Sequence, residues 1–75
     1  MKLEVDENLI RRFDLTTAVL VAVADSADLW PVKVSHMVQT FPYLDHRTIR
    51  TRFDSLAKEG VLQKVMQENV PVYEK

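Results

Sequence analysis

Residues 44–64 read LDHRTIRTRFDSLAKEGVLQK, and this stretch decides the fold. It predicts one helix from about Asp45 to Glu59. Asp45 is a favourable N-cap, because its carboxylate can accept hydrogen bonds from the free amides of the first turn. Apolar residues recur at i, i+4 and i+7 and so share one buried face: Ile49, Phe53 and Leu56. Gly60 stands where a residue with a left-handed conformation ends a helix at least cost.

The remaining faces of this helix are polar and carry a local excess of positive charge. Residues 45–58 include three arginines and one lysine against two aspartates, although the whole chain has a net charge of −1. The side chains expected to meet solvent or a ligand are His46, Arg47, Arg50, Thr51 and Asp54. A helix with a basic outer face fits the major groove of DNA. Because the charge is local, non-specific affinity should be modest and salt-sensitive.

The composition limits the class of protein. A chain of 75 residues is enough for one small domain, and 47% hydrophobic residues are enough for a core. There is no cysteine, so a disulfide framework and a thiolate metal site are excluded. The longest apolar run, residues 18–24, is far shorter than the roughly 20 residues that span a bilayer, and the start, MKLEVDENL, lacks the apolar segment of a signal peptide. We therefore expect a soluble, cytoplasmic protein without a membrane partner.

Two helices are expected before residue 29. The spacing of Leu9, Ile10 and Phe13 predicts a short helix within residues 3–13. Residues 15–24, LTTAVLVAVA, are ambiguous, because their valines favour a strand whereas their length, alanines and leucines favour a helix. We predict a helix, capped by Thr16, because the downstream pattern requires a first helix to pack against.

A second helix of the core is expected at Val32–Thr40. The residue before a proline is biased towards extended structure, so residues 29–31 should be extended and Pro31 should occupy the first helical turn. The inner face of this helix would consist of Val34, Met37, Val38 and Phe41. Residues 41–44, FPYL, form the turn to the third helix.

The C-terminal residues predict a β-hairpin. Val61–Gln67 and Val70–Glu74 are rich in valine and are typical of strands. Glu68 and Asn69 stand between them, and asparagine tolerates a positive φ, which favours a two-residue turn. Pro71 lacks an amide donor and therefore predicts an edge strand.

The order of helix, short strand, helix, turn, helix and hairpin resembles that of winged helix-turn-helix domains. LTTAVLVAVAD resembles their first helix, VKVSHMVQTFPYLDHRTIRTRFDSLAKEGVL their helix-turn-helix, and QKVMQENVPVYEK their wing. The pattern TI-x-x-R-x-x-x-L-x-x-x-G, residues 48–60, is similar to the recognition helix of many bacterial and archaeal winged-helix regulators. The resemblance implies an α+β, mostly α fold in a single domain, 1–75. It would comprise an N-terminal extension with a short extra helix at 1–14, a three-helix core at 15–60 and a two-stranded wing at 61–75.

Two features depart from the family pattern. The turn FPYL is bulkier than the tight glycine-containing turn common in the motif. The wing tip, residues 67–70, has no arginine or lysine, whereas many relatives reach the minor groove or a phosphate with a basic side chain there. Lys64 is the only basic residue on the strands before the tip.

The resemblance and the basic face together predict DNA contacts. Arg47 and Arg50, in the first turns of the third helix, could bind a guanine edge or a phosphate, or could form a solvated charge face. Arg52, expected near Lys33 or the wing, could equally bind a phosphate or form a surface ion pair. The remaining predicted contacts to bases or phosphates are His46, Thr51, Lys33 early in the second helix, and Lys64.

Other chemistry has little support. His36 and His46 stand ten residues apart with no cysteine nearby, so surface histidines are a better interpretation than a metal site. No Gly-x-Ser-x-Gly motif is present and a catalytic cleft has little room, so we expect no enzyme, cofactor or small-molecule ligand. Trp30 and Phe41 are expected in the core and Tyr43 partly exposed in the turn, rather than as stacking platforms for single strands.

Residues 18–24 are apolar all round, although a surface helix should have a polar side. Either the N-terminal segment and the wing cover this helix or it meets another subunit; with the helix expected at 3–13, this favours a homodimer. The leading hypothesis is thus a small sequence-specific transcriptional regulator that binds double-stranded DNA. The alternative is a winged-helix module that binds a partner protein and no nucleic acid. The acidic N-terminal half and the wing tip without basic residues favour the alternative.

Overall fold

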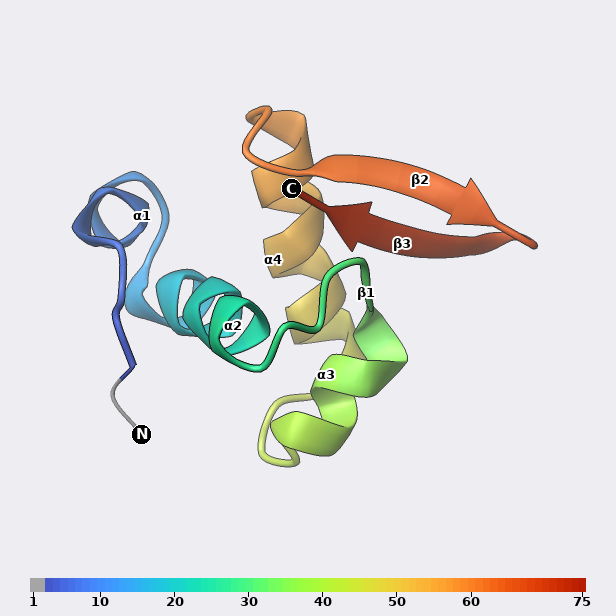
Figure 1. The fold of residues 1–75 in the computed structure, drawn as a ribbon, viewed down its shortest axis with the longest axis horizontal. Helices are drawn as coiled ribbons and strands as arrows, with labels where there is room; N and C mark the ends of the chain where they lie inside the picture. Colours follow the sequence, from blue (N-terminus) through green and yellow to red (C-terminus); the bar gives the residue numbers. More distant parts are fainter. Residues whose placement is uncertain (1–2) are drawn as a thin grey trace.

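The computed structural model describes residues 3–75, and within them an α+β fold of four helices and three strands (Figure 1). In chain order the elements are α1 (Glu7–Arg12), α2 (Leu15–Ser26), β1 (Val32–Lys33), α3 (Val34–Thr40), α4 (His46–Lys58), β2 (Gln63–Gln67) and β3 (Val70–Glu74). Helix α4 lies at the centre of the view, with α1 and α2 on one side and the β2–β3 hairpin on the other (Figure 1). Residues 1–2 of the predicted N-terminal extension lie outside the described residues.

Carboxylate caps fix where the two longest helices begin. The Asp45 carboxylate accepts a hydrogen bond from the Thr48 amide at 2.7 Å, which confirms the predicted N-cap of α4. Helix α2 is capped by Asp14, whose carboxylate accepts from the Thr17 amide at 2.8 Å. The prediction of Thr16 as the cap is therefore wrong. Thr16 is itself helical, and only a residue with non-helical backbone before the first turn can cap that turn.

Two turns contain the left-handed residues that the sequence predicts. Gly60 follows α4 with a φ of +81°, which confirms it as the helix stop. Glu68 and Asn69 have φ values of 50° and 68° and form the two-residue turn between β2 and β3. The hairpin is thereby confirmed, with β2 beginning two residues later than predicted, at Gln63.

Residues 32–33 form a strand instead of the start of a helix. Strand β1 pairs with β3 in antiparallel order, with Val32 opposite Tyr73. Helix α3 therefore begins at Val34, and the prediction that Pro31 occupies the first turn of this helix is wrong. Val32 is fully buried, so its backbone needs partners. Pairing with β3 supplies them while the side chain enters the core.

The sheet has the order β1-β3-β2, so β3 is its central strand. The edge strand predicted from Pro71 is therefore wrong. Pro71 lies opposite Met66 of β2, whereas β1 reaches only to Lys33, opposite Val72. Because Pro71 lies beyond the end of β1, its missing amide costs the ladder no hydrogen bond on that side.

The predicted apolar stripe of α4 forms the centre of the core. Its three members are all fully buried, as predicted: Ile49, Phe53 and Leu56. The Phe53 ring lies 5.2 Å from the Tyr73 ring and 6.3 Å from the Trp30 ring, measured between centroids. Trp30 and Phe41 pack half-buried against this core. Tyr43 is 88% exposed, which is more than the partial exposure predicted for it.

Helix α2 is covered largely by its own chain. Its buried residues are Thr17, Ala18, Leu20, Val21, Ala22 and Ala24. Helix α1 packs against α2 and contributes the buried Leu9 to the core, which confirms the short N-terminal helix. Of the two explanations for the apolar run, cover within the chain accounts for these residues. Across residues 3–75, every helix is too short or too polar to cross a bilayer.

Candidate nucleic-acid interface

The outer side of α4 carries the predicted contact residues at helical spacing. His46, Arg47, Arg50 and Thr51 are all exposed. Within residues 3–75, the Arg47 guanidinium has no ion-pair partner. The Thr51 hydroxyl donates a hydrogen bond to the Arg47 carbonyl at 2.8 Å, so only its oxygen lone pairs are free to meet a ligand. Arg47 is therefore the most available cation on this side of the helix.

Asp54, which the sequence places among the side chains expected to meet solvent or a ligand, connects α4 to the hairpin. Its Oδ1 accepts a hydrogen bond from the Tyr73 hydroxyl at 2.5 Å and lies 3.0 Å from Lys64 Nζ. Its Oδ2 lies 3.9 Å from Arg50 Nε. Two of the predicted DNA contacts, Arg50 and Lys64, thus share one carboxylate. The i,i+4 spacing from Arg50 was the only signal of this in the sequence.

The surroundings of the Asp54–Tyr73 pair shift the pKa of both groups. Burial raises the pKa of the Tyr73 hydroxyl, and the adjacent Asp54 carboxylate raises it further. Burial alone would raise the pKa of Asp54, but the hydrogen bonds from Tyr73 and Lys64 outweigh it and the net pKa is lowered. Asp54 is therefore a fixed negative charge at neutral pH, and Tyr73 is a fixed donor.

Arg52 binds the first helix of the core rather than lying near Lys33 or the wing, where the sequence analysis placed it. Its Nη1 lies 2.5 Å from Asp14 Oδ2, and Asp14 also caps α2. Its Nε is buried and has no hydrogen-bond partner among the described residues. Burial opposes the ionisation of Asp14, but hydrogen bonds from Thr17 and the charge of Arg52 lower its pKa overall. Of the two roles left open for Arg52, the ion pair is the one present.

A small hollow of about 90 Å³ brings the first turn of α4 together with α3 and β3. His46, Arg50 and Ser35 supply its polar groups, and Val34, Val70 and Pro71 supply its apolar wall. Lys33 is exposed in β1, so it projects from the sheet and not from the second helix of the core, where it was expected. The hairpin, α3 and α4 thus meet around the N-terminal end of α4.

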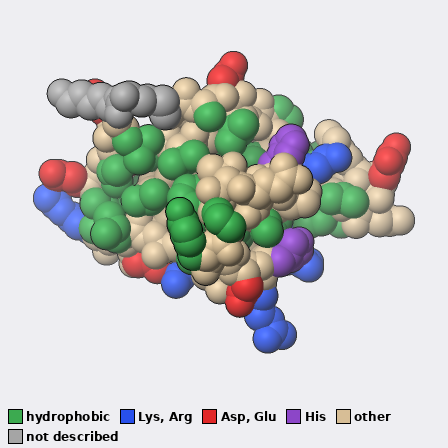
Figure 2. Space-filling model, turned by 90° about the horizontal axis from the view of Figure 1, so that it is seen from below, with side chains coloured by type: hydrophobic (Ala, Val, Ile, Leu, Met, Phe, Trp, Pro, Cys, Tyr) green, Lys and Arg blue, Asp and Glu red, His purple; other side chains and the backbone are tan. Residues whose placement is uncertain are grey.

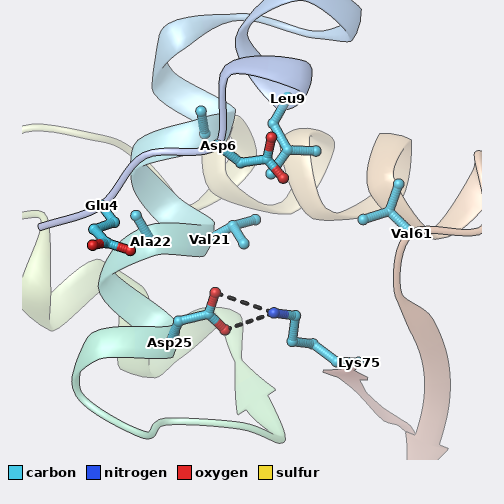
Figure 3. Close-up of a pocket in the computed structure, with 9 residues that line it drawn as sticks. Glu4, Asp6, Leu9, Val21, Ala22, Asp25, Val61 and Lys75 are labelled. Carbon is cyan, nitrogen blue, oxygen red and sulfur yellow. Dashed lines mark hydrogen bonds and ion pairs between the residues drawn. The ribbon is translucent and has the colours of Figure 1, made fainter.

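A separate polar cluster joins the C-terminus to α2 (Figure 3). Lys75 Nζ lies 2.9 and 3.1 Å from the two carboxylate oxygens of Asp25. Trp30 Nε1 donates to the same carboxylate at 2.6 Å. Glu4 and Asp6 line the adjoining hollow of about 110 Å³ (Figure 3). In the part of the chain that the structure describes, no three His, Asp or Glu residues are grouped so that they could hold a metal ion.

Comparison of the chain with protein-family models, with curated proteins and with solved structures found no match. The chain thus presents a helix with exposed cations beside a hairpin, and the Asp54 carboxylate of that helix holds one cation from each, Arg50 of α4 and Lys64 of β2.

Proposed function

We propose that this chain is a winged helix-turn-helix protein that binds double-stranded DNA and regulates transcription. In this proposal α3 and α4 with the turn between them are the helix-turn-helix, and the β2–β3 hairpin is the wing. Helix α4 would enter the major groove, which is wide enough for one helix and presents a distinct pattern of donors and acceptors for each base pair.

The observation that carries the proposal is the outward side of α4. Arg47 is exposed and has no ion-pair partner within residues 3–75. Arg50 and His46 lie beside it at the hollow next to β3, on the side of α4 that faces the hairpin. The opposite face of the same helix is the centre of the core, so the backbone that presents these side chains is held rigidly.

The proposed contacts divide into two groups. Arg47, Arg50, His46 and Thr51 would meet base edges or the phosphates beside them, and Lys33 and Lys64 would meet phosphates. Arg52 is held by Asp14 and contributes only if that ion pair opens. About four cations are available for phosphates. A plot of the logarithm of the binding constant against the logarithm of the salt concentration should therefore have a slope of about −3 to −4.

Alanine substitution tests the proposal. Arg47→Ala and Arg50→Ala should each weaken binding to a duplex selected from a random pool, by about 1–3 kcal/mol where the arginine contacts a base. Arg11→Ala is the matched control, because Arg11 is an exposed arginine on α1 whose ion-pair partner within residues 3–75 is Glu7, at 3.8 Å. Fluorescence anisotropy with labelled duplex measures all three. If both α4 variants bind as the wild type does, the proposed face is wrong.

Binding of a partner protein is the second candidate function, and an apolar hollow favours it. The hollow, of about 240 Å³, lies between α2 and the α3–α4 turn. Leu15 and Tyr43 at this hollow are 59% and 88% exposed. Figure 2 shows the molecule from below, with most of the hydrophobic side chains of this view on its left and in its centre and the histidines to the right of centre.

Chemical-shift perturbation by NMR separates the two functions. Titration with a random-sequence duplex at low and moderate salt should first shift the amides of residues 45–58 if α4 binds DNA. Shifts confined to α1 and α2, or no shifts, would contradict the DNA-binding proposal.

Homodimerisation stays a prediction, with less support than the apolar run of α2 provides by itself. The apolar run of α2 is largely covered within the chain, so it no longer requires a second subunit. A dimer on DNA would place two α4 helices about 34 Å apart on a palindromic site. Sedimentation equilibrium tests this directly, because a particle of 8.7 kDa at every concentration would contradict the dimer. The cytoplasmic location also stays a prediction.

A further inference from the structure

If α4 binds DNA as proposed, the structure supports a second role on the same surface. We propose that Asp54 determines specificity: its carboxylate accepts a hydrogen bond from the amino group of a cytosine in the major groove, and its charge weakens binding to phosphates of any sequence. This inference rests on the proposed function. It assigns a specificity role to an acidic residue on a face whose other charged residues are mainly basic.

The position of Asp54 places it on the recognition side of α4. It follows Arg47 by seven residues and Arg50 by four, so the three residues lie along one stripe of the helix. Its side chain is 39% exposed, whereas the next residue on its N-terminal side, Phe53, is fully buried. A helix that places Arg47 in the groove also brings Asp54 to the DNA, two turns further along.

The Asp54 carboxylate is held in place by a rigid donor. The Tyr73 hydroxyl donates to Oδ1 at 2.5 Å, and the Tyr73 ring is fully buried and stacked on Phe53. Lys64 Nζ lies 3.0 Å from the same oxygen. An exposed aspartate normally rotates away from an approaching phosphate. Asp54 is held in place, because the Tyr73 hydroxyl that donates to it sits on a buried ring that cannot move with it. The negative charge therefore stays on the face when DNA binds.

The second carboxylate oxygen remains open to a ligand. Oδ2 accepts no hydrogen bond from residues 3–75, and its ion-pair partner, Arg50 Nε, is 3.9 Å away, beyond hydrogen-bonding distance. A carboxylate oxygen has lone pairs for more than one donor. Oδ2 is thus an oriented acceptor on a side chain that is 39% exposed, with a cation beside it.

The hydrogen-bonding groups on the base edges in the major groove determine which base can pair with Asp54 Oδ2. In the major groove guanine presents only acceptors and thymine an acceptor and a methyl group, so both repel a carboxylate or fail to pair with it. Adenine has an amino donor, but its N7 acceptor lies next to it. Cytosine presents an amino donor without a neighbouring acceptor, and it is the base that carboxylates contact. A fixed Asp54 therefore favours a C·G pair at one position.

The same charge reduces affinity for DNA in general. Asp54 offsets the charges of Arg50 on α4 and Lys64 on β2, and it repels phosphates directly. This loss is the same for every sequence, whereas the cytosine contact is gained at one position only. A residue of this kind raises the ratio of specific to non-specific affinity, which decides occupancy among many competing sites.

Asp54→Asn is the decisive variant, because it removes the charge and retains an oxygen that can accept from Tyr73. Two measurements are made with the full chain: anisotropy with a random-sequence duplex between about 50 and 200 mM NaCl, and selection of bound sequences from a randomised duplex pool. We expect tighter binding to random sequence, with a log–log salt slope steeper by about one. We also expect the preference for C at one position to fall about tenfold or to change to A, because an amide pairs with adenine.

Two controls separate charge from position. Asp28→Asn makes the same charge change at an exposed loop residue after α2, and it should leave both the salt slope and the selected sequences nearly unchanged. Tyr73→Phe removes the anchor but keeps the charge, so it should reduce the discrimination at that one position without a change in the salt slope. Thermal melts of all variants confirm that the proteins compared are folded.

Each result bears on the proposal. If the wild type binds duplex DNA but Asp54→Asn has the same salt slope and selects the same sequences, the role of Asp54 is refuted while the proposed function stands. A gain in random-sequence affinity with an unchanged selected sequence refutes the cytosine contact. A wild-type protein that binds no duplex refutes the proposed function, and this inference with it.

Discussion

Replacing Tyr73 by phenylalanine tests how much the Tyr73–Asp54 hydrogen bond stabilises the contact between the hairpin and α4. The Tyr73 hydroxyl donates to Asp54 at 2.5 Å, and the Tyr73 ring is fully buried in the core. The substitution removes the hydroxyl and leaves the ring stacked on Phe53, with centroids 5.2 Å apart. Any change in stability therefore reports the hydrogen bond rather than a cavity.

The surroundings of the Tyr73 hydroxyl determine how much free energy of unfolding the substitution should cost. A hydrogen bond to a charged group contributes about 1.5–3 kcal/mol. In the variant the Asp54 carboxylate would retain its ion pair with Lys64. The Asp54 side chain is 39% exposed, so a water molecule can replace part of the hydrogen bonding that the hydroxyl supplied. We therefore expect a loss of about 1–2 kcal/mol in the free energy of unfolding near neutral pH. For a domain of this size that corresponds to a fall in Tm of roughly 5–15 °C.

The pH dependence gives a second, independent readout. The pKa of Tyr73 is raised in the folded state, first by burial and then by Asp54. The contribution of the Tyr73 hydroxyl to the free energy of unfolding is therefore complete below the ordinary tyrosine pKa of 10.0. It is lost as the pH rises above 10.0 towards the raised pKa of Tyr73 in the folded protein. The wild type should lose up to about 1.4 kcal/mol per pH unit in that range from this group, whereas Tyr73→Phe should not.

Urea unfolding of both proteins at neutral pH and at several values above pH 10 measures the difference in free energy. Other lysines and tyrosines titrate in both proteins, so their contribution cancels in the comparison. The reasoning is refuted if the two proteins are equally stable at neutral pH, or if their difference does not shrink as the pH rises.

Two further substitutions test the local reasoning. Gly60→Ala should cost about 1 kcal/mol in thermal unfolding, because the φ of +81° disfavours a β-carbon although nothing lies within 4 Å of where it would stand; a neutral or stabilising effect would contradict this. Asp14→Ala removes both the cap of α2 and the partner of Arg52, so it should cost about 1–2 kcal/mol, more than Asp6→Ala at the cap of the short α1. Equal effects of the two aspartates would show that the Asp14–Arg52 ion pair adds nothing.

The helix at the centre of the fold was predictable because its signals are local. The cap at Asp45, the apolar stripe and the stop at Gly60 all lie within a few residues of the backbone that they control. The turn at Glu68 and Asn69 was predictable for the same reason, since its conformation depends on the residues in it. The amphipathic pattern likewise identified which face of α4 is exposed.

The second helix and the sheet were harder to predict, because distant parts of the chain decide them. Val32 and Lys33 follow a proline in a pattern that suits a helix, but β3, some forty residues later, offers a pairing partner. That pairing also makes β3 central, against the local preference of Pro71 for an edge. Backbone hydrogen bonds of this kind leave no periodic trace in the sequence.

By itself, then, the amino-acid sequence determined the α4 helix, its buried stripe, its exposed arginines and the hairpin turn, because neighbouring residues set each of these through backbone geometry and periodic burial. Only the tertiary structure decided which charges remain free. Asp14, the N-cap of α2, forms an ion pair with Arg52, and Asp54 holds Arg50 and Lys64 while Tyr73 of β3 donates a hydrogen bond to it. The Arg52–Asp14, Lys64–Asp54 and Tyr73–Asp54 contacts join residues that are distant in the sequence, so they depend on how helices and strands pack. That packing leaves Arg47 unpaired within the described chain and Asp54 fixed at the surface.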